Sequence, residues 1–239
     1  MLGALLTALG VLGTLGGGAL AAHAYSNSQQ DVPNAEAYGP VLWRNETAGE
    51  LFPATVGDPP NSEYEASDEK IAQWRRMGIS QETSCSKGLS GETKKTAQQL
   101  GCEAVVRATY VDLTGEMVAT VAIIVLPKSA TDAQEMGEYL QGQSGEEFPE
   151  GAVVPFKVAG TLAAKWDESR RNGMGGAGLG GNLPYAVAVT TGAVDGRGAG
   201  ALPDEFGEYG ADVEDRRPWM NAAEALSKSF HVHITRLER

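Results

Sequence analysis

The sequence predicts an α+β domain with a mainly antiparallel sheet and helices packed mostly on one face, behind an apolar N-terminal helix. Three observations lead to this prediction. Residues 102–126 read as one long β-hairpin, several amphipathic helical segments lie on either side of it, and residues 2–22 carry no charged side chain. Strands and helices that do not alternate regularly are typical of an α+β fold.

The hairpin is the central predicted element. Its first strand alternates apolar side chains with others, and the period of two places one set on a single buried face. That set is Cys102, Ala104, Val106, Ala108 and Tyr110. The break at residues 112–115 contains Gly115, which suits a hairpin loop. Residues 117–126 are almost wholly apolar, which predicts a central strand covered on both sides.

Helical signals predict four further elements. We expect helices over residues 66–77, 91–100, 132–141 and 218–230. The second helix has the clearest limits, because Ser90 can cap its start and Gly101 can end it. Apolar side chains recur at helical spacing in the third and fourth segments, so each of them should pack one face against the sheet.

Three more strands complete the predicted order α-α-β-β-α-β-β-α-β. They cover residues 156–166, 184–194 and 231–235. A glycine-rich stretch, 173–181, separates the first two. Such a stretch can cradle a phosphate, but the Walker spacing with its Lys-Ser/Thr is absent and no amphipathic helix follows. We interpret it as a mobile hairpin connection.

The apolar run at residues 2–22 is long enough to cross a bilayer as a helix. It has two interpretations. A retained signal anchor is one, and Gly13 and Gly17 stand at the G-x-x-x-G spacing of close-packed membrane helices. A signal peptide cleaved after Ala24 is the other, because residues 22–24 read Ala-His-Ala. No basic residue precedes Leu2, which is compatible with a start upstream of Met1.

Both interpretations give the same topology and the same division of the chain. Residues 1–24 form the anchor or signal peptide, residues 25–40 a polar tether, and residues 41–239 one extracytoplasmic domain. The membrane is then a partner through residues 2–22. The expected location is the cell membrane, with a single span and the C-terminal domain outside, or the exterior after cleavage.

The chain has two cysteines, Cys85 and Cys102. They could be two reduced, buried thiols. In an exported domain, however, two cysteines with a short helix between them are expected to pair. A bridge over a loop of this size stabilises by roughly 3 kcal/mol in the chain-entropy view. A metal pair is disfavoured, because nothing near them supplies two further ligands.

The formal net charge of −12 lies wholly outside residues 1–24. An acidic domain is repelled by phosphate backbones and by anionic lipid headgroups, so we expect no nucleic-acid partner. Part of this charge lies in residues 195–215. Such a loop could hold Ca²⁺, but its acidic residues follow no EF-hand spacing. We interpret it as a solvated loop.

Candidate catalytic and metal-binding residues are few. On a strand, His231 and His233 would share one face and form a weak candidate metal site, but the sequence offers no third ligand. An exposed edge strand with two imidazoles is the alternative. The chain contains no G-x-S-x-G elbow, zinc-protease helix or dinucleotide fingerprint. The sequence does not decide whether two of its many carboxylates form a catalytic acid–base pair. We therefore expect no enzyme, no catalytic residue and no cofactor.

Several segments together resemble uncharacterised membrane-anchored extracytoplasmic proteins of high-GC actinobacteria. They are the apolar N-terminus, the stretch 39–44, the hairpin 102–126 and the stretch 183–187. The helices on an antiparallel sheet with a disulfide also resemble extracytoplasmic sensor domains of bacterial membrane kinases. This resemblance implies no active-site residue.

Three functions follow as expectations. The first is a non-catalytic domain that binds or scaffolds cell-envelope components, with an envelope protein as partner. The second is a ligand-sensing domain, in which the glycine-rich stretch is a lid over a pocket. The third is a hydrolase of unrecognised type.

Overall fold

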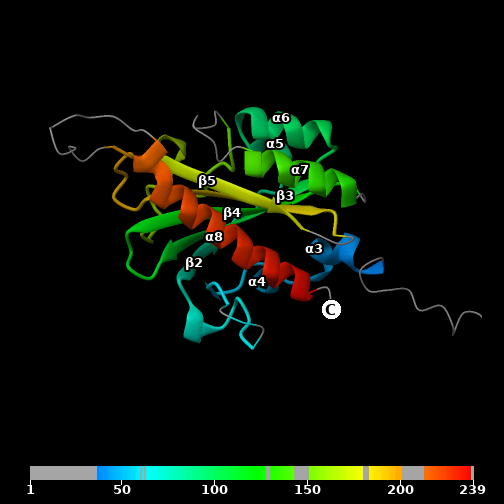
Figure 1. Ribbon diagram of the computed structural model, residues 1–239, viewed down its shortest axis with the longest axis horizontal. Helices are drawn as coiled ribbons and strands as arrows, with labels where there is room; N and C mark the ends of the chain where they lie inside the picture. Colours follow the sequence, from blue (N-terminus) through cyan, green and yellow to red (C-terminus); the bar gives the residue numbers. More distant parts are fainter. Residues whose placement is uncertain are drawn as a thin grey trace, which may run out of the picture.

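The computed structural model describes residues 37–59, 61, 63–127, 130–142, 151–179, 183–200 and 213–237. In this part of the chain, six strands form one antiparallel sheet in the order β1-β2-β3-β4-β6-β5 (Figure 1). The strands are β1 Thr55–Val56, β2 Trp74–Ile79, β3 Ala104–Asp112, β4 Met117–Val125, β5 Arg171–Gly178 and β6 Tyr185–Ala193. The predicted α+β class is confirmed.

Helices surround this sheet. The α-helices are α3 Leu42–Asn45, α4 Ala48–Leu51, α5 Cys85–Gly88, α6 Gly91–Gln99, α7 Ala130–Gly142 and α8 Val213–Leu237. Short 3-10 turns are η1 Gly39–Val41, η2 Glu69–Ile71 and η3 Glu168–Arg170. The helices predicted over residues 91–100 and 132–141 are confirmed as α6 and α7. The fourth predicted helix is confirmed as part of α8, which is longer at both ends.

The predicted hairpin is confirmed as β3 and β4, which pair from Ala104↔Val125 to Val111↔Val118. β4 lies in the middle of the sheet and is buried along nearly all of its length. Its Val121 and Ile123 belong to one hydrophobic cluster, whereas Ala122 belongs to the cluster on the opposite face. An apolar strand without a polar face therefore has a cover on both sides.

The prediction that helices pack mostly on one face is wrong. Side chains of α8, such as Leu226 and Phe230, join the cluster on one face together with residues of α3 and α4. Side chains of α5, α6 and α7 join the cluster on the other face, with Met136 of α7 among them. The reason is β4 itself, because its two apolar faces both need a layer of helices.

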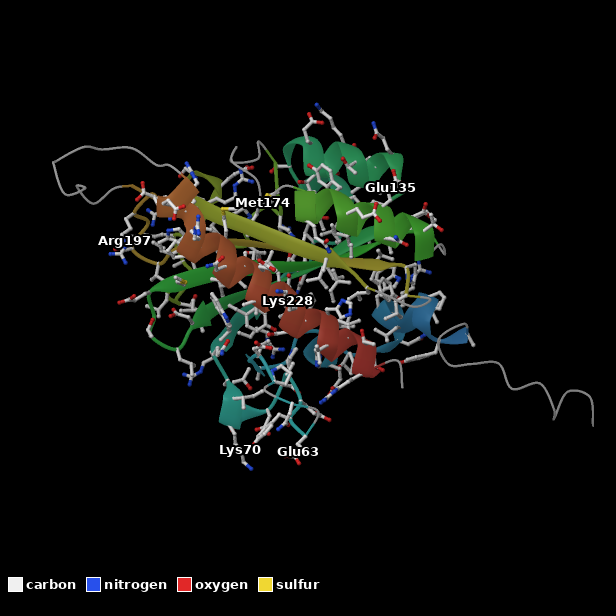
Figure 2. The ribbon with its side chains drawn as sticks, viewed as in Figure 1. Glu63, Lys70, Glu135, Met174, Arg197 and Lys228 are labelled. Carbon is white, nitrogen blue, oxygen red and sulfur yellow. A yellow bond between two sulfur atoms is a disulfide. The ribbon has the colours of Figure 1, made fainter. Side chains whose placement is uncertain are left out.

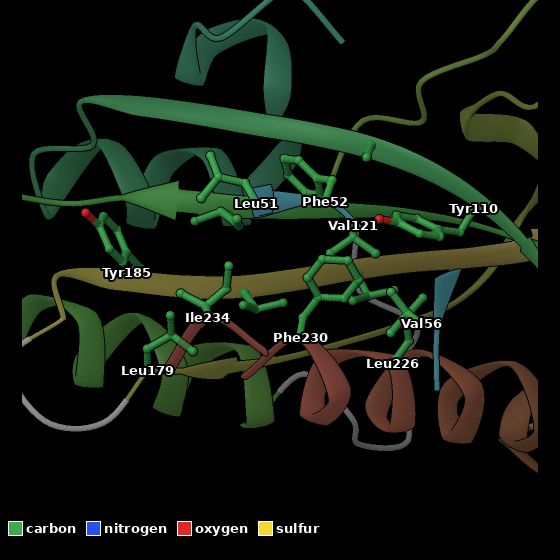
Figure 3. Close-up of a cluster of buried hydrophobic side chains, with 14 of the residues drawn as sticks. Leu51, Phe52, Val56, Tyr110, Val121, Leu179, Tyr185, Leu226, Phe230 and Ile234 are labelled. Atoms are coloured by element: carbon green, nitrogen blue, oxygen red, sulfur yellow. The ribbon is translucent and has the colours of Figure 1, made fainter. Parts of the chain in front are cut away.

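Aromatic packing fixes the C-terminal half of α8. The Phe230 ring lies 5.5 Å from the Tyr110 ring of β3 and 5.9 Å from Phe52, measured between centroids (Figure 3). The buried Tyr110 hydroxyl donates to the Pro53 carbonyl at 2.9 Å. Leu51 and Phe52 therefore fill a gap under α8.

The Cys85–Cys102 disulfide is confirmed, with the two Cα atoms 6.3 Å apart. Cys85 begins α5, and Cys102 stands between α6 and β3. Gly101 ends α6 with a φ of 77°, a conformation that favours glycine. The bridge therefore fastens the α5–α6 unit to the start of the central hairpin.

The helix predicted over residues 66–77 is wrong. Within it only η2 is helical, and β2 begins at Trp74. β2 pairs with β3 through Arg75↔Val111 and Arg76↔Tyr110. Ile71, Trp74 and Met77 stand at helical spacing in the sequence, but pairing with a neighbouring strand overrides weak local propensity.

The strand predicted over residues 156–166 is also wrong, because this segment consists of turns and irregular backbone. Polar side chains of the central hairpin hold it against the sheet. The Trp166 indole N–H donates to the Thr120 hydroxyl at 2.8 Å, and the Phe156 N–H donates to the same oxygen at 3.1 Å. Its place beside β6 is taken by β5.

Residues 173–178 of the glycine-rich stretch belong to β5, so the prediction of a mobile connection is wrong for them, whereas Gly180 and Gly181 lie outside the described residues. The strand pairs with β6 from Arg171↔Gly192 to Gly178↔Ala186. Its successive residues alternately face α8 and α7. A Cβ added to Gly173 would lie 2.5 Å from a Trp219 backbone carbon of α8, and one added to Gly178 would lie 2.5 Å from the Ala133 carbonyl oxygen of α7.

The absence of side chains lets two helices approach one strand at backbone distance. Gly137 of α7 shows this most clearly, because a Cβ there would lie 2.3 Å from the Gly178 nitrogen. Glycine is unfavourable in a strand for conformational reasons, and a close backbone approach is a known reason to keep it there. The glycines of β5 are therefore packing residues.

The N-terminal predictions lie outside the described residues, which begin at residue 37. This applies to the apolar helix, the cleavage site and most of the tether. Within the described residues, no helix combines the length and apolar character needed to cross a bilayer. The end of the predicted tether is packed, because Gly39 is buried and its carbonyl accepts a hydrogen bond from the Tyr185 hydroxyl.

We predict that Gly137→Ala destabilises the protein by about 1–3 kcal/mol, because the new methyl group must displace the β5 backbone. Helix propensity alone would make this substitution stabilising by about 1 kcal/mol, so a loss of stability must come from the contact with β5. Urea unfolding of each variant measures the free energy of unfolding.

Gly142→Ala at the end of the same helix is the matched control, because a Cβ built there meets no neighbouring atom of the described residues within 4 Å. It should leave stability unchanged or raise it by less than about 1 kcal/mol. If both substitutions stabilise the protein equally, β5 does not pack on α7 in the way described.

Candidate functional site

The two histidines proposed as weak metal candidates do not form a site together. Residues 231–235 are predicted as a strand, but they continue α8. Residues two apart on a helix point roughly 200° apart, so His231 and His233 do not share a face. Among the described residues, no group of three or more His, Cys, Asp or Glu side chains is arranged to hold a metal ion.

His233 has a structural position. It is 7% exposed, and its Nε2–H donates to the Glu50 carbonyl at 2.6 Å. Its ring also meets the edge of Phe230, with 6.3 Å between centroids. Burial lowers the pKa of His233, and the hydrogen bond to Glu50 only partly opposes this effect. The imidazole therefore ties the end of α8 to α4.

The strongest candidate site is a groove at the edge of the sheet, with a cavity volume of about 560 Å³. It is bordered by the C-terminal end of α7, by β5 and by one flank of α8. Figure 2 labels Met174 on β5 and Lys228 on α8, which belong to two of these walls. The lining residues are Leu140, Gln141, Met174, Gly175, Gly176, Ala177, Arg217, Met220, Asn221, Glu224, Ser227 and Lys228.

The groove wraps around an edge strand, because its walls come from both faces of the sheet. Leu140 belongs to the cluster on the α7 face, whereas α8 covers the opposite face. The sheet order ends at β5, so in the described part of the chain no strand pairs with its outer side. The floor of the groove is therefore the outer strand of the sheet.

The backbone of β5 offers hydrogen-bonding groups to this groove. Leu179 N–H donates to the Tyr185 carbonyl at 2.9 Å, which makes these two residues a hydrogen-bonded pair. Such pairs recur at every second residue of an antiparallel ladder, so Gly175↔Val189 is another. Met174 and Gly176 lie between the bonded positions and direct their N–H and C=O groups outward.

The edge is recessed between the two helices. Residues 172–176 are buried although β5 is an outer strand. The cause is the glycine packing, because helices that contact the backbone of the strand also extend past it.

The groove is lined by three charged side chains, those of Arg217, Glu224 and Lys228. Lys228 Nζ lies 2.7 Å from Glu224 Oε1 on the same helix, and this hydrogen bond raises the pKa of Lys228. An ammonium group with a raised pKa stays protonated at neutral pH, so it does not act as a general base. Arg217 pairs with Glu214. The lining thus contains two basic side chains and one acidic side chain in a chain of net charge −12.

Sequence reasoning missed this groove. Its walls come from three segments, and only α7 and part of α8 are predicted as helices in the right places. The one signal in the sequence was the glycine-rich stretch itself, since glycines can mark a close approach of backbones inside a strand. The acidic stretch 195–215 does not contribute to the groove in the described residues, and residues 201–212 lie outside them.

Comparisons of the chain with protein-family models, with curated proteins and with solved structures find no match. The resemblance to actinobacterial membrane-anchored proteins and to kinase sensor domains therefore stays an expectation.

We predict that the stabilising contribution of His233 depends on pH. The ordinary histidine pKa of about 6.5 applies in the unfolded chain. Because burial depresses the folded pKa, the contribution is present above about pH 6.5 and is lost as the pH falls from there through the lowered folded value. Urea unfolding between about pH 7 and about pH 5 should show a steeper loss of stability for the native chain than for His233→Gln. Equal slopes would contradict this role.

Proposed function

We propose that this protein is a non-catalytic binding domain of the cell envelope, and that it binds a segment of a partner protein in the groove between α7, β5 and α8. The observation that supports this proposal best is the groove of about 560 Å³ that has the outer strand of the sheet as its floor. Sheet edges flanked by a helix are a recurring site of peptide recognition.

The chemistry of the groove supports binding over catalysis. Its titratable lining side chains are Arg217, Glu224 and Lys228, and the last two are paired with each other. None of the lining residues is a histidine or a cysteine. A nucleophile next to a suitable base is the usual signature of covalent catalysis, and the described groove offers no such pair.

A ligand-sensing domain is the second candidate, and the volume of the groove favours it. About 560 Å³ falls within the usual range for small-molecule pockets. The sequence suggests a sensor in which the glycine-rich stretch is a lid over the pocket, but residues 173–178 of that stretch form a packed strand. Such pockets are also mostly enclosed and apolar, whereas polar side chains border this groove.

Two features support an extracytoplasmic location for this function. The Cys85–Cys102 disulfide suits an oxidising compartment. The uncharged run at residues 2–22 suits an anchor or a signal peptide, and both would export the domain. An envelope protein is therefore the class of partner we expect.

A display experiment tests the binding function. We expect the full-length protein in detergent micelles to enrich families of linear peptides from a random phage library. Asn221→Trp should abolish their binding, because Asn221 is an exposed residue of α8 on the groove wall. Gln98→Trp on α6 is the matched control, since it is exposed on a helix and does not line the groove.

The contrary outcome is also specific. The protein is a ligand sensor if two results are obtained together. The first is that no peptide family is enriched. The second is that native mass spectrometry finds a small molecule bound to the native chain and to Gln98→Trp but not to Asn221→Trp.

A protease experiment tests the location. In protoplasts of the native host, added protease should digest the domain, and a retained anchor should resist a carbonate wash. A domain that stays intact until the protoplasts are lysed would contradict the extracytoplasmic location and leave the binding test unaffected.

A further inference from the structure

The two edges of the sheet differ in how well they are protected. β1, at one edge, is two residues long, and the chain near η2 packs closely on the residue after it, because a Cβ on Gly57 would lie 1.9 Å from the Ile71 carbonyl oxygen. β5, at the other edge, is eight residues long and contains no Pro. Proteins normally protect a long edge strand with charges, bulges or cover. A long edge without a covering strand is therefore a candidate docking surface.

β5 has one irregularity, which leaves most of its edge regular. The register with β6 shifts between Arg171 and Gly173, and from Gly173 to Gly178 the pairing is continuous. Met174 and Gly176 therefore direct their backbone groups outward at the spacing of a strand, about 7 Å apart. An added strand needs donors and acceptors at that spacing.

The recess of this edge decides between a single peptide chain and a second copy of the protein. Edge-to-edge pairing of two copies would bring α7 and α8 of each copy against the same helices of the other before the two strands met. A single extended chain has no helices attached and can enter. The observed burial of residues 172–176 therefore favours a peptide segment.

We propose that the partner's segment binds by strand addition to β5, pairing with the outward groups of Met174 and Gly176 and becoming the seventh strand of the sheet. This inference rests on the binding function proposed above and specifies its mechanism. Main-chain hydrogen bonds supply affinity in this mode, and the pockets that receive alternate side chains supply specificity.

The walls of the groove define the chemistry of the segment. Side chains of an added strand alternate between the two faces, as those of β5 do. Those on the α7 side meet Leu140 and Met174, so we expect apolar residues there. Those on the α8 side meet Asn221 and Lys228, so we expect amide or carboxylate side chains there. The partner is an extended segment with this alternation and without Pro at the paired positions.

An N-methyl scan of the best peptide from the display selection tests this mechanism. N-methylation removes one backbone donor and adds bulk at that position without changing the side chain. We expect it to weaken binding about tenfold or more at every second residue of the peptide, where the N–H faces β5. At the intervening residues binding should change by less than about threefold. Fluorescence anisotropy with the full-length protein in micelles measures each affinity.

Amide exchange of the protein supplies a second readout. Peptide addition should slow exchange of the Met174 and Gly176 amides and leave Gly175, which pairs with β6, unchanged. This effect requires the peptide backbone to lie along the strand. A peptide that binds only through its side chains would not produce it.

The other outcomes overturn the inference in different ways. Peptide binding that tolerates every N-methyl group, or that is lost equally at all positions, leaves the binding function standing and removes strand addition. A concentration-dependent dimer that Asn221→Trp dissociates and Gln98→Trp preserves makes a second copy the occupant. Failure to enrich any peptide removes the proposed function and the inference with it.

Discussion

The close approach of two helices to one glycine-rich strand is the constraint on which the rest of the structure depends. α8 contacts the β5 backbone at Gly173, and α7 contacts it at Gly178 and through its own Gly137. Side chains at these positions would push the helices away from the sheet. The strand loses conformational stability through its glycines, and the structure recovers it through packing on both sides.

This constraint produces the shape of the candidate site. Because β4 is apolar on both faces, helices must cover both faces of the sheet, and the last two, α7 and α8, extend over its outer strand. Because β5 is narrow, these helices lie close together across the edge and form a groove there. Core packing and the candidate groove therefore have the same cause, which is the small side chains of β5.

The sequence predicts the elements whose signals are local. The hairpin alternates cleanly, α6 has Ser90 and Gly101 at its ends, and the two cysteines flank one short helix. The missed elements depend on tertiary contacts. Nothing near β5 marks it as a strand, since glycine has low strand propensity and only the adjoining helices stabilise it. The alternation at His231 and His233 misled the prediction, because the segment continues a long helix. The groove could not be predicted, because it depends on how three segments meet.

Backbone amide exchange in the free, full-length protein, measured residue by residue by NMR, tests the central claim most directly. Gly173, Gly175 and Ala177 should exchange as slowly as their partners in β6, because their N–H groups are bonded to that strand. Met174 and Gly176 should exchange faster, because their N–H groups face the groove. Uniformly fast exchange throughout residues 172–178 would contradict the account, because the segment would then be the mobile connection that its composition suggests.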